Sequence, residues 1–281
     1  MLEIDQHVIS DIGRSFSIPA QPSLLLKLQQ LINHSDPDIN EVAELISQDA
    51  AISAIIMKTV NSPIYGLARS MSDIQKAVRY IGINGIMSLV SSILIRQSFK
   101  QPQCSIALEE FWRNASNIAN TNVIIGKSLK QAVSIDKLFT LGLFHDCGIP
   151  VMAMKYTDYT ETYEQAMTTP SQSLTTIEEN TYQINHATLG YYVASSWRLP
   201  RDICQLILSH HDRNYLLTKG NRLQQFYFAI LKMSENIVHN NLHFKDTTDW
   251  AYLSDHIFTV LDLNEDHYQD LLEDCVETQL T

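Results

Sequence analysis

Apolar residues recur at helical spacing along nearly the whole 281-residue chain, and this periodicity restricts the fold more than any other feature. The stretch PSLLLKLQQLINH, for example, has leucine or isoleucine at positions 24, 25, 28, 31 and 32, on one face of an amphipathic helix. Similar patterns occupy residues 35–49, 50–63, 109–129, 185–200 and 222–240. No alternating pattern longer than a few residues predicts a strand. The sequence therefore predicts an all-α fold.

The segment KQPQCS, residues 100–105, is the best candidate for an internal boundary. It is polar, contains proline and separates two strongly periodic segments. We therefore predict an N-terminal helical half over residues 1–103 and a second helical half over residues 104–245. Residues 246–281 then form a C-terminal appendage.

This appendage is acidic: it holds 10 Asp and Glu residues and no Lys or Arg, whereas the whole chain has a net charge of −11. Such an end disfavours general nucleic-acid binding, which needs cations for the phosphates. The pattern is nevertheless not that of a disordered tail, because Tyr268, Leu271, Leu272, Cys275 and Val276 share helical spacing. We expect a folded helix with one acidic face.

The sequence also predicts where the protein resides. No stretch approaches the roughly 20 uninterrupted apolar residues of a membrane span, and the N-terminus MLEIDQHVISDIG has acids where a signal peptide needs bases. Its four cysteines are scattered without a C-x-x-C pair, which favours reduced thiols. We expect a cytoplasmic protein that does not associate with a membrane.

Two ionisable residues, His145 and Asp146, stand inside the apolar run LGLFHDCGIPV. Burying them costs free energy unless partners satisfy them. His186, His210, His211 and Glu235 lie on other predicted helices, and imidazoles plus carboxylates from several helices can build a metal site. The alternative is a hydrogen-bonded core pair, with the histidines of SHHD at a solvated helix end.

Several ordered segments resemble the HD superfamily of metal-dependent phosphohydrolases, and more closely its HDOD branch, over roughly residues 15–240. These segments are IPAQPSLLLKLQQLI, ELISQDAAISAIIMKTVNSPIYG, SDIQKAVRYIGINGI, EEFWRNASNIA, FTLGLFHDCGI, NHATLGYYVASSWRLP and ILSHHD. The resemblance implies an HDOD architecture in bacterial signalling proteins, with an N-terminal helical half packed on an HD-like half. It also implies a site related to that of the HD-GYP phosphodiesterases.

The chain departs from the catalytic relatives at three positions. Asn114 stands where they have a ligand histidine, Ile149 where they have a lysine, and Glu235 where they have an aspartate. By this resemblance the first metal position, beside His145, is weakened. The second position, formed by Asp146, His186, His210 and His211, retains all its ligands.

These observations leave three hypotheses. The first is an HDOD-type signalling domain with a degenerate HD site, which acts on a protein partner or ligand and can form a homodimer. The alternative is a metal-dependent phosphohydrolase of nucleotides or phosphate esters, in which Asp146 would be the essential residue. The third is an assembly protein whose histidines bind no metal. A metal, if bound, would be Mn, Fe, Ni or Zn, which suit imidazole and carboxylate ligands.

Overall fold

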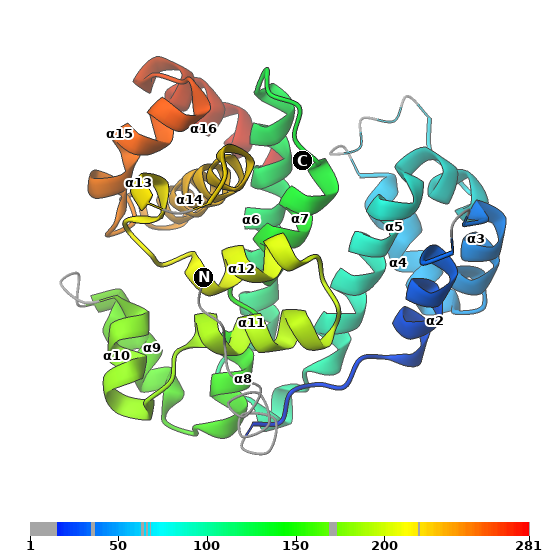
Figure 1. Cartoon of the computed structure of the whole chain (residues 1–281), viewed down its shortest axis with the longest axis horizontal. Coiled ribbons are helices and arrows are strands. Elements are labelled where there is room, and N and C mark those ends of the chain that lie inside the picture. The colour runs from blue at the N-terminus through cyan, green and yellow to red at the C-terminus, as the bar shows by residue number, and fades with distance from the viewer. Residues whose placement is uncertain are drawn as a thin grey trace.

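The structure is a computed structural model that describes residues 16–34, 37–62, 65, 67, 69–168, 173–218 and 220–280, without the side chains of residues 167–168 and 276–280. Helices and their connections make up this described part, which contains no strand, so the all-α prediction is confirmed. Figure 1 shows two groups of helices side by side, with the C-terminal helices packed against the second group.

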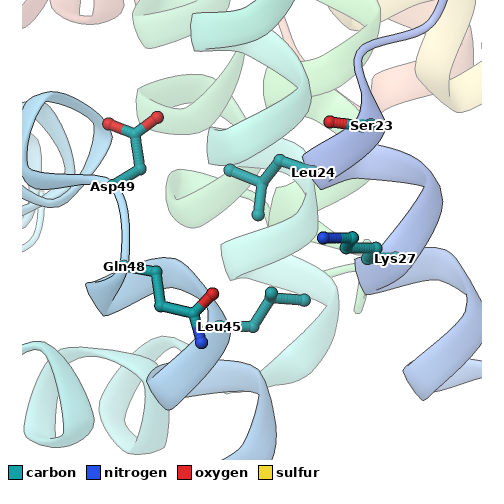
Figure 2. A pocket seen from close by; sticks show the side chains of 6 residues that line it. All are labelled: Ser23, Leu24, Lys27, Leu45, Gln48 and Asp49. Atoms are coloured by element: carbon teal, nitrogen blue, oxygen red, sulfur yellow. The ribbon is translucent and has the colours of Figure 1, made fainter.

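The first group consists of α2 (Ser23–Ile32), α3 (Ile39–Ser47), α4 (Ala50–Val60) and α5 (Ile74–Ser98). Asp38, Asp49 and Asp73 accept hydrogen bonds from backbone N–H groups in the first turns of α3, α4 and α5, which fixes where these helices begin. The long helix α5 packs against the other three and bends at Gly82, where φ is +79°. A small surface pocket opens between α2 and the end of α3 (Figure 2).

The second group begins after the short 3-10 turn η2 (Gln101–Gln103), within the predicted boundary segment. It contains α6 (Leu108–Ser128), α7 (Ile135–Phe144), α8 (Gly148–Lys155), α9 (Tyr159–Thr168), α10 (Leu174–Tyr182), α11 (His186–Ser196), α12 (Arg201–Ser209), α13 (Tyr215–Thr218) and α14 (Arg222–His243). Helices α6, α7 and α14 pack on one another, and α11 packs between α8 and α12. The two layers bring the ends of α7, α11 and α12 together.

Contacts between the two groups are both apolar and polar. Helix α5 packs against α7, where the hydroxyl of Thr140 donates to that of Ser88 at 2.9 Å. Trp197, fully buried at the end of α11, donates from Nε1 to the carbonyl of Pro19. Its own carbonyl accepts from the side chain of Gln29. The end of α11 is thereby tied to the first group of helices.

A close contact between α8 and α11 sets the position of the site. A Cβ atom on Gly148 would lie 1.9 Å from the carbonyl oxygen of His186 and 2.6 Å from the backbone nitrogen of Gly190. Only glycine at position 148 permits this approach without moving backbone. Gly148 lies two residues after Asp146, so this contact holds the His145–Asp146 pair close to the start of α11.

Residues after Lys245 form α15 (Trp250–Leu261) and α16 (Glu265–Leu280), seen at the upper left of Figure 1. Their buried side chains include Leu253, Ile257, Tyr268 and Cys275, and the helices pack against α14 and α6. Asn264 caps α16 by accepting from the N–H of His267. The appendage is thus docked on the second group through its apolar stripe, although the side chain of Val276 lies outside the described residues.

One described helix, α5, is long and apolar enough to cross a membrane by length and composition. Half of the apolar stretch in this helix is buried inside the fold. Burial of that kind is the pattern of a core helix.

Candidate metal centre

His145 and Asp146 lie where α7 ends, between that helix and Gly148. His145 closes α7 and is buried, whereas the Asp146 side chain is 27% exposed. The apolar neighbours that flank the pair, such as Leu143, Phe144 and Ile149, are buried. The pair therefore sits at the edge of the core, with the Asp146 carboxylate accessible from one side.

Three more histidines converge on Asp146. His186 is the first residue of α11, which is capped by the side chain of Asn185, while His210 and His211 follow the last residue of α12. One possible ligand atom from each of Asp146, His186, His210 and His211 lies within 4.8 Å of all the others. The structure thus brings together four residues that the sequence singled out from three separate segments.

The distances describe a ring around the carboxylate. Oδ1 of Asp146 lies 3.1 Å from Nε2 of His210 and 3.3 Å from Nε2 of His186, and its Oδ2 lies 3.1 Å from Nε2 of His145. Nε2 of His211 is 2.9 Å from Nε2 of His186. The Nε2 atoms of His186 and His210 thus approach one carboxylate oxygen, and that of His145 approaches the other.

The opposite ring nitrogens of three histidines are already committed to hydrogen bonds. Nδ1–H of His145 donates to the carbonyl of Gly142 at 2.7 Å, and Nδ1–H of His210 donates to the carbonyl of Ile207 at 2.6 Å. Nδ1–H of His186 donates to Glu178 at 2.7 Å. A neutral imidazole with its proton on Nδ1 presents the lone pair of Nε2, which is the form that binds a metal.

The charges of the metal-free cluster follow from this crowding. Burial opposes ionisation of Asp146, but the charge of His145 and hydrogen bonds from His145, His186 and His210 outweigh it, and its pKa lies well below the usual range. Burial likewise opposes protonation of His186, yet Glu178 and Asp146 raise its pKa to about 10. The pKa of His145 is also raised, by Asp146 and Glu235 against burial.

The other two histidines shift in the opposite direction. Burial lowers the pKa of His210, and the charges of His145 and His186 add to that effect. Burial, together with the charges of His210, His186 and Lys232, holds the pKa of His211 well below its usual range. Without a metal, the cluster therefore combines protonated and neutral imidazoles around one carboxylate.

Glu178 was not among the residues singled out from the sequence. Its side chain is fully buried, and it accepts from both the backbone N–H and Nδ1–H of His186 and from the hydroxyl of Tyr159. A signal was present: Glu178 shares a helical face with Leu174, Ile177 and Tyr182, which predicts burial. A carboxylate behind a ligating histidine fixes the ring orientation and tautomer.

On the other side of Asp146, Glu235 approaches His145, with 3.7 Å between its Oε1 and Nε2 of the histidine. Within the described structure this Oε1 is buried and has no hydrogen-bond partner. Its Oε2 binds Lys232 at 2.5 Å. Lys232 is a buried cation that the sequence did not single out.

Asn114 lies half-buried on α6. No hydrogen bond or ion pair joins its side chain to the cluster within the described residues, so its role as a metal-lining residue stays a prediction. The pocket of Figure 2 involves Ser23, Leu24, Lys27, Leu45, Gln48 and Asp49 and none of the cluster residues.

With this geometry in place, comparison with protein families matches the HDOD domain over residues 18–213, which is most of the chain. The chain belongs to the HDOD family. An uncharacterized protein from Treponema pallidum (strain Nichols) is 28% identical over 205 residues. That match covers 69% of this chain and 38% of the relative, so the chain spans less than half of the relative's length.

Solved structures share the fold of this HDOD protein. An HDOD domain protein from Geobacter sulfurreducens has a TM-score of 0.75 at 20% identity, and the match covers 98% of this chain and 95% of that one. A "Putative signal transduction protein" from Marinobacter aquaeolei VT8 has a TM-score of 0.73 at 16% identity, covering 99% and 65%. A "Putative phosphohydrolase" from Shewanella amazonensis SB2B has 0.71 at 18% identity, covering 96% and 93%.

The residues present suit a divalent transition metal. Three imidazoles and one carboxylate match the ligand preferences of Zn, Mn, Fe and Ni, and they can supply the four ligands of a tetrahedral site. The hydrogen bonds of their Nδ1 atoms orient the rings of His186 and His210 so that Nε2 can bind such an ion. The fold therefore places a donor set suited to a transition metal in one location.

Proposed function

We propose that this HDOD protein is a metal-binding regulatory domain that acts through a protein partner or a small ligand rather than by turnover. One observation carries the proposal: the ligand atoms of Asp146, His186, His210 and His211 lie within 4.8 Å of one another. The "Putative signal transduction protein" of similar fold supports a signalling role.

Metal binding also resolves the crowding in the metal-free cluster. Three Nε2 atoms approach the single carboxylate of Asp146 within 3.3 Å, and each needs a proton there to donate a hydrogen bond. Because the three Nδ1 atoms already carry protons, protonation of Nε2 makes the ring cationic. A cation held by Asp146, His186, His210 and His211 accepts the Nε2 lone pairs of His186 and His210 and removes this requirement for both rings.

The departures from the catalytic relatives favour binding over turnover. Asn114 supplies no imidazole to the first metal position, and the buried Ile149 supplies no cation for a phosphate. Lys232 does not fill that role, because Glu235 and Asp249 already pair with it at 2.5 and 2.9 Å. We accordingly expect regulation through occupancy of the site, with self-association or a partner protein as the output.

Metal analysis of protein purified without a His tag tests the proposal. Inductively coupled plasma mass spectrometry should find a stoichiometric transition metal in the wild type, and Asp146→Ala should abolish it. Asp255→Ala, at an exposed aspartate on α15, is the matched control and should retain the metal. Wild-type protein that stays metal-free after loading with Mn, Fe, Ni and Zn would refute metal binding.

A metal-dependent phosphohydrolase is the second candidate, because the Asp146 carboxylate is 27% exposed and a phosphate ester could reach it. A metal at this position would supply an activated water for attack on phosphorus. The "Putative phosphohydrolase" of similar fold is consistent with this candidate. Turnover of p-nitrophenyl phosphate, bis-p-nitrophenyl phosphate or nucleotides that disappears in Asp146→Ala would place the enzyme first.

A further inference from the structure

Lys232 is a lysine in the interior of a helix-rich core, and its ammonium group has two carboxylate partners. It is 3% exposed, and Nζ lies 2.5 Å from Oε2 of Glu235 and 2.9 Å from Oδ2 of Asp249. A buried ammonium needs such partners, because an unpaired charge in the core is strongly unfavourable. Lys232 is therefore a fixed cation inside the fold.

Asp249 reaches this position from the C-terminal appendage. It occupies the N-terminal cap of α15, yet its side chain makes no capping hydrogen bond and pairs with Lys232 instead. Helix α14, which carries Lys232 and Glu235, packs against α15. The appendage thus contributes a charge to the polar region beside the histidine cluster.

Glu235 connects this cation to the cluster. One carboxylate oxygen is held by Lys232, while the other is buried, lacks a hydrogen bond within the described structure and lies 3.7 Å from Nε2 of His145. A metal held between His145 and Glu235 would bind one oxygen of the Glu235 carboxylate while the ammonium group of Lys232 binds the other. The repulsion between two cations at that separation opposes such binding.

We propose that the ammonium group of Lys232 takes the place of a second metal ion, so that the site binds a single divalent cation on the Asp146, His186, His210 and His211 side. This inference rests on the proposed metal-binding function and specifies its stoichiometry. It assigns Glu235 to Lys232 rather than to a metal, and it makes Lys232 and Asp249 the residues that balance the charge of Glu235.

Metal stoichiometry tests the inference directly. Metal-free protein is loaded with Mn, desalted and analysed by mass spectrometry, and electron paramagnetic resonance reports whether bound Mn ions are isolated or spin-coupled. We expect one equivalent of isolated Mn in the wild type. Two equivalents with a spin-coupled signal would overturn the inference and leave the proposed function intact. No bound Mn, Fe, Ni or Zn would overturn the proposed function and the inference with it.

Substitution of the lysine gives the complementary result. Lys232→Met keeps an unbranched side chain, one atom shorter, and removes its charge, so Glu235 and Asp249 become available and bound Mn should rise from one to two equivalents. Lys245→Met, at an exposed lysine in the segment that follows α14, should stay at one. A folded Lys232→Met protein that still binds one equivalent would overturn the inference.

Glu235→Gln provides a test that does not depend on the folding of Lys232→Met. The amide retains the size of Glu235 and can still accept a hydrogen bond from Lys232. If Glu235 serves Lys232, the Mn affinity should change by less than about threefold. A loss of roughly 10-fold or more, the range expected on removing a metal-supporting group, would identify Glu235 as a metal ligand and overturn the inference.

Discussion

Glu178 accepts a hydrogen bond from Nδ1–H of His186 at 2.7 Å, and both side chains are fully buried. The same carboxylate accepts from the backbone N–H of His186 and from the hydroxyl of Tyr159. These three donors fix the carboxylate, and the carboxylate in turn fixes the ring so that Nε2 faces Asp146. Helices α9 and α10 thus support a residue at the start of α11.

Replacement of Glu178 tests this support. Glu178→Gln removes the charge behind His186 but retains an acceptor oxygen, so the metal should bind roughly 10- to 100-fold more weakly with unchanged stoichiometry. Isothermal titration calorimetry with Zn or Mn measures the affinity. Glu161→Gln, the same change at an exposed position on α9, should match the wild type. Equal affinities for all three proteins would contradict a positioning role for Glu178.

Metal binding should release protons. Because the pKa of His186 is raised to about 10, this ring is protonated at neutral pH in the metal-free protein, and it must lose a proton to become a ligand. Metal affinity should therefore rise as pH increases from about 6.5 towards 10 and fall as the solution is acidified. The pKa of His145 is also raised, so any loss of its proton on metal binding would make the metal affinity rise with pH in the same way.

Calorimetry in buffers of different ionisation enthalpy gives the number of protons released per metal. The wild type should release more protons at neutral pH than Glu178→Gln, in which the pKa of His186 loses its largest upward contribution. A binding enthalpy that is independent of the buffer would show that His186 is already neutral, and the assigned charge state would be wrong.

The histidine cluster was largely predictable from the sequence, because the ordered segments around FHDCG, NHATLG and SHHD fix which residues meet. The buried residues that support the cluster, Glu178 and Lys232, were not predicted, because their contacts join segments far apart in the sequence. Glu178 could have been found from its position on the apolar face of α10, and Lys232 from the apolar residues around it on α14. Their pairing with Tyr159 and Asp249 depends on how separate helices pack, and no local pattern specifies that.

The division of the chain illustrates the same limit. The polar segment 100–105 does fall between α5 and α6, as the break in periodicity indicates. The contacts of Trp197 with Pro19 and Gln29, however, join residues about 170 positions apart, and the contact of Thr140 on α7 with Ser88 on α5 joins residues 52 positions apart. The boundary at residue 103 stays a prediction, since a break in helical pattern does not show whether two halves fold independently.

Gly148→Ala should destabilise the protein and disturb the site together. The new Cβ would lie 1.9 Å from the carbonyl oxygen of His186, and the backbone must move to relieve this overlap. We expect a loss of at least about 1–3 kcal/mol in the free energy of unfolding, the usual cost of overpacking, together with weaker metal binding. Urea denaturation and calorimetry measure the two effects.

Gly190→Ala is the matched comparison on the facing helix. Its Cβ would meet a methyl group of Ile207 at 3.0 Å and the backbone nitrogen of Gly148 at 3.4 Å, contacts that a shift of a few tenths of an ångström relieves. The effect should be clearly smaller than that of Gly148→Ala. If the two variants were equally stable, the close approach of α8 and α11 would not explain the glycine in FHDCG.

Asn236 should hold the appendage to α14. Its side chain is fully buried, donates to Asp246 at 3.0 Å and to the hydroxyl of Tyr268 at 2.8 Å, and accepts from the N–H of Thr247 at 2.7 Å. Asn236→Ala removes these bonds and leaves the hydroxyl of the buried Tyr268 unpaired, at a cost of about 1–3 kcal/mol. Hydrogen exchange should therefore quicken in α15 and α16 and remain unchanged in α2–α4.

Asn240→Ala, which removes a single exposed hydrogen bond to Asp246, should have little effect. Uniformly slow exchange in the Asn236→Ala appendage would mean that the apolar stripe of Leu253, Ile257 and Tyr268 alone secures the docking.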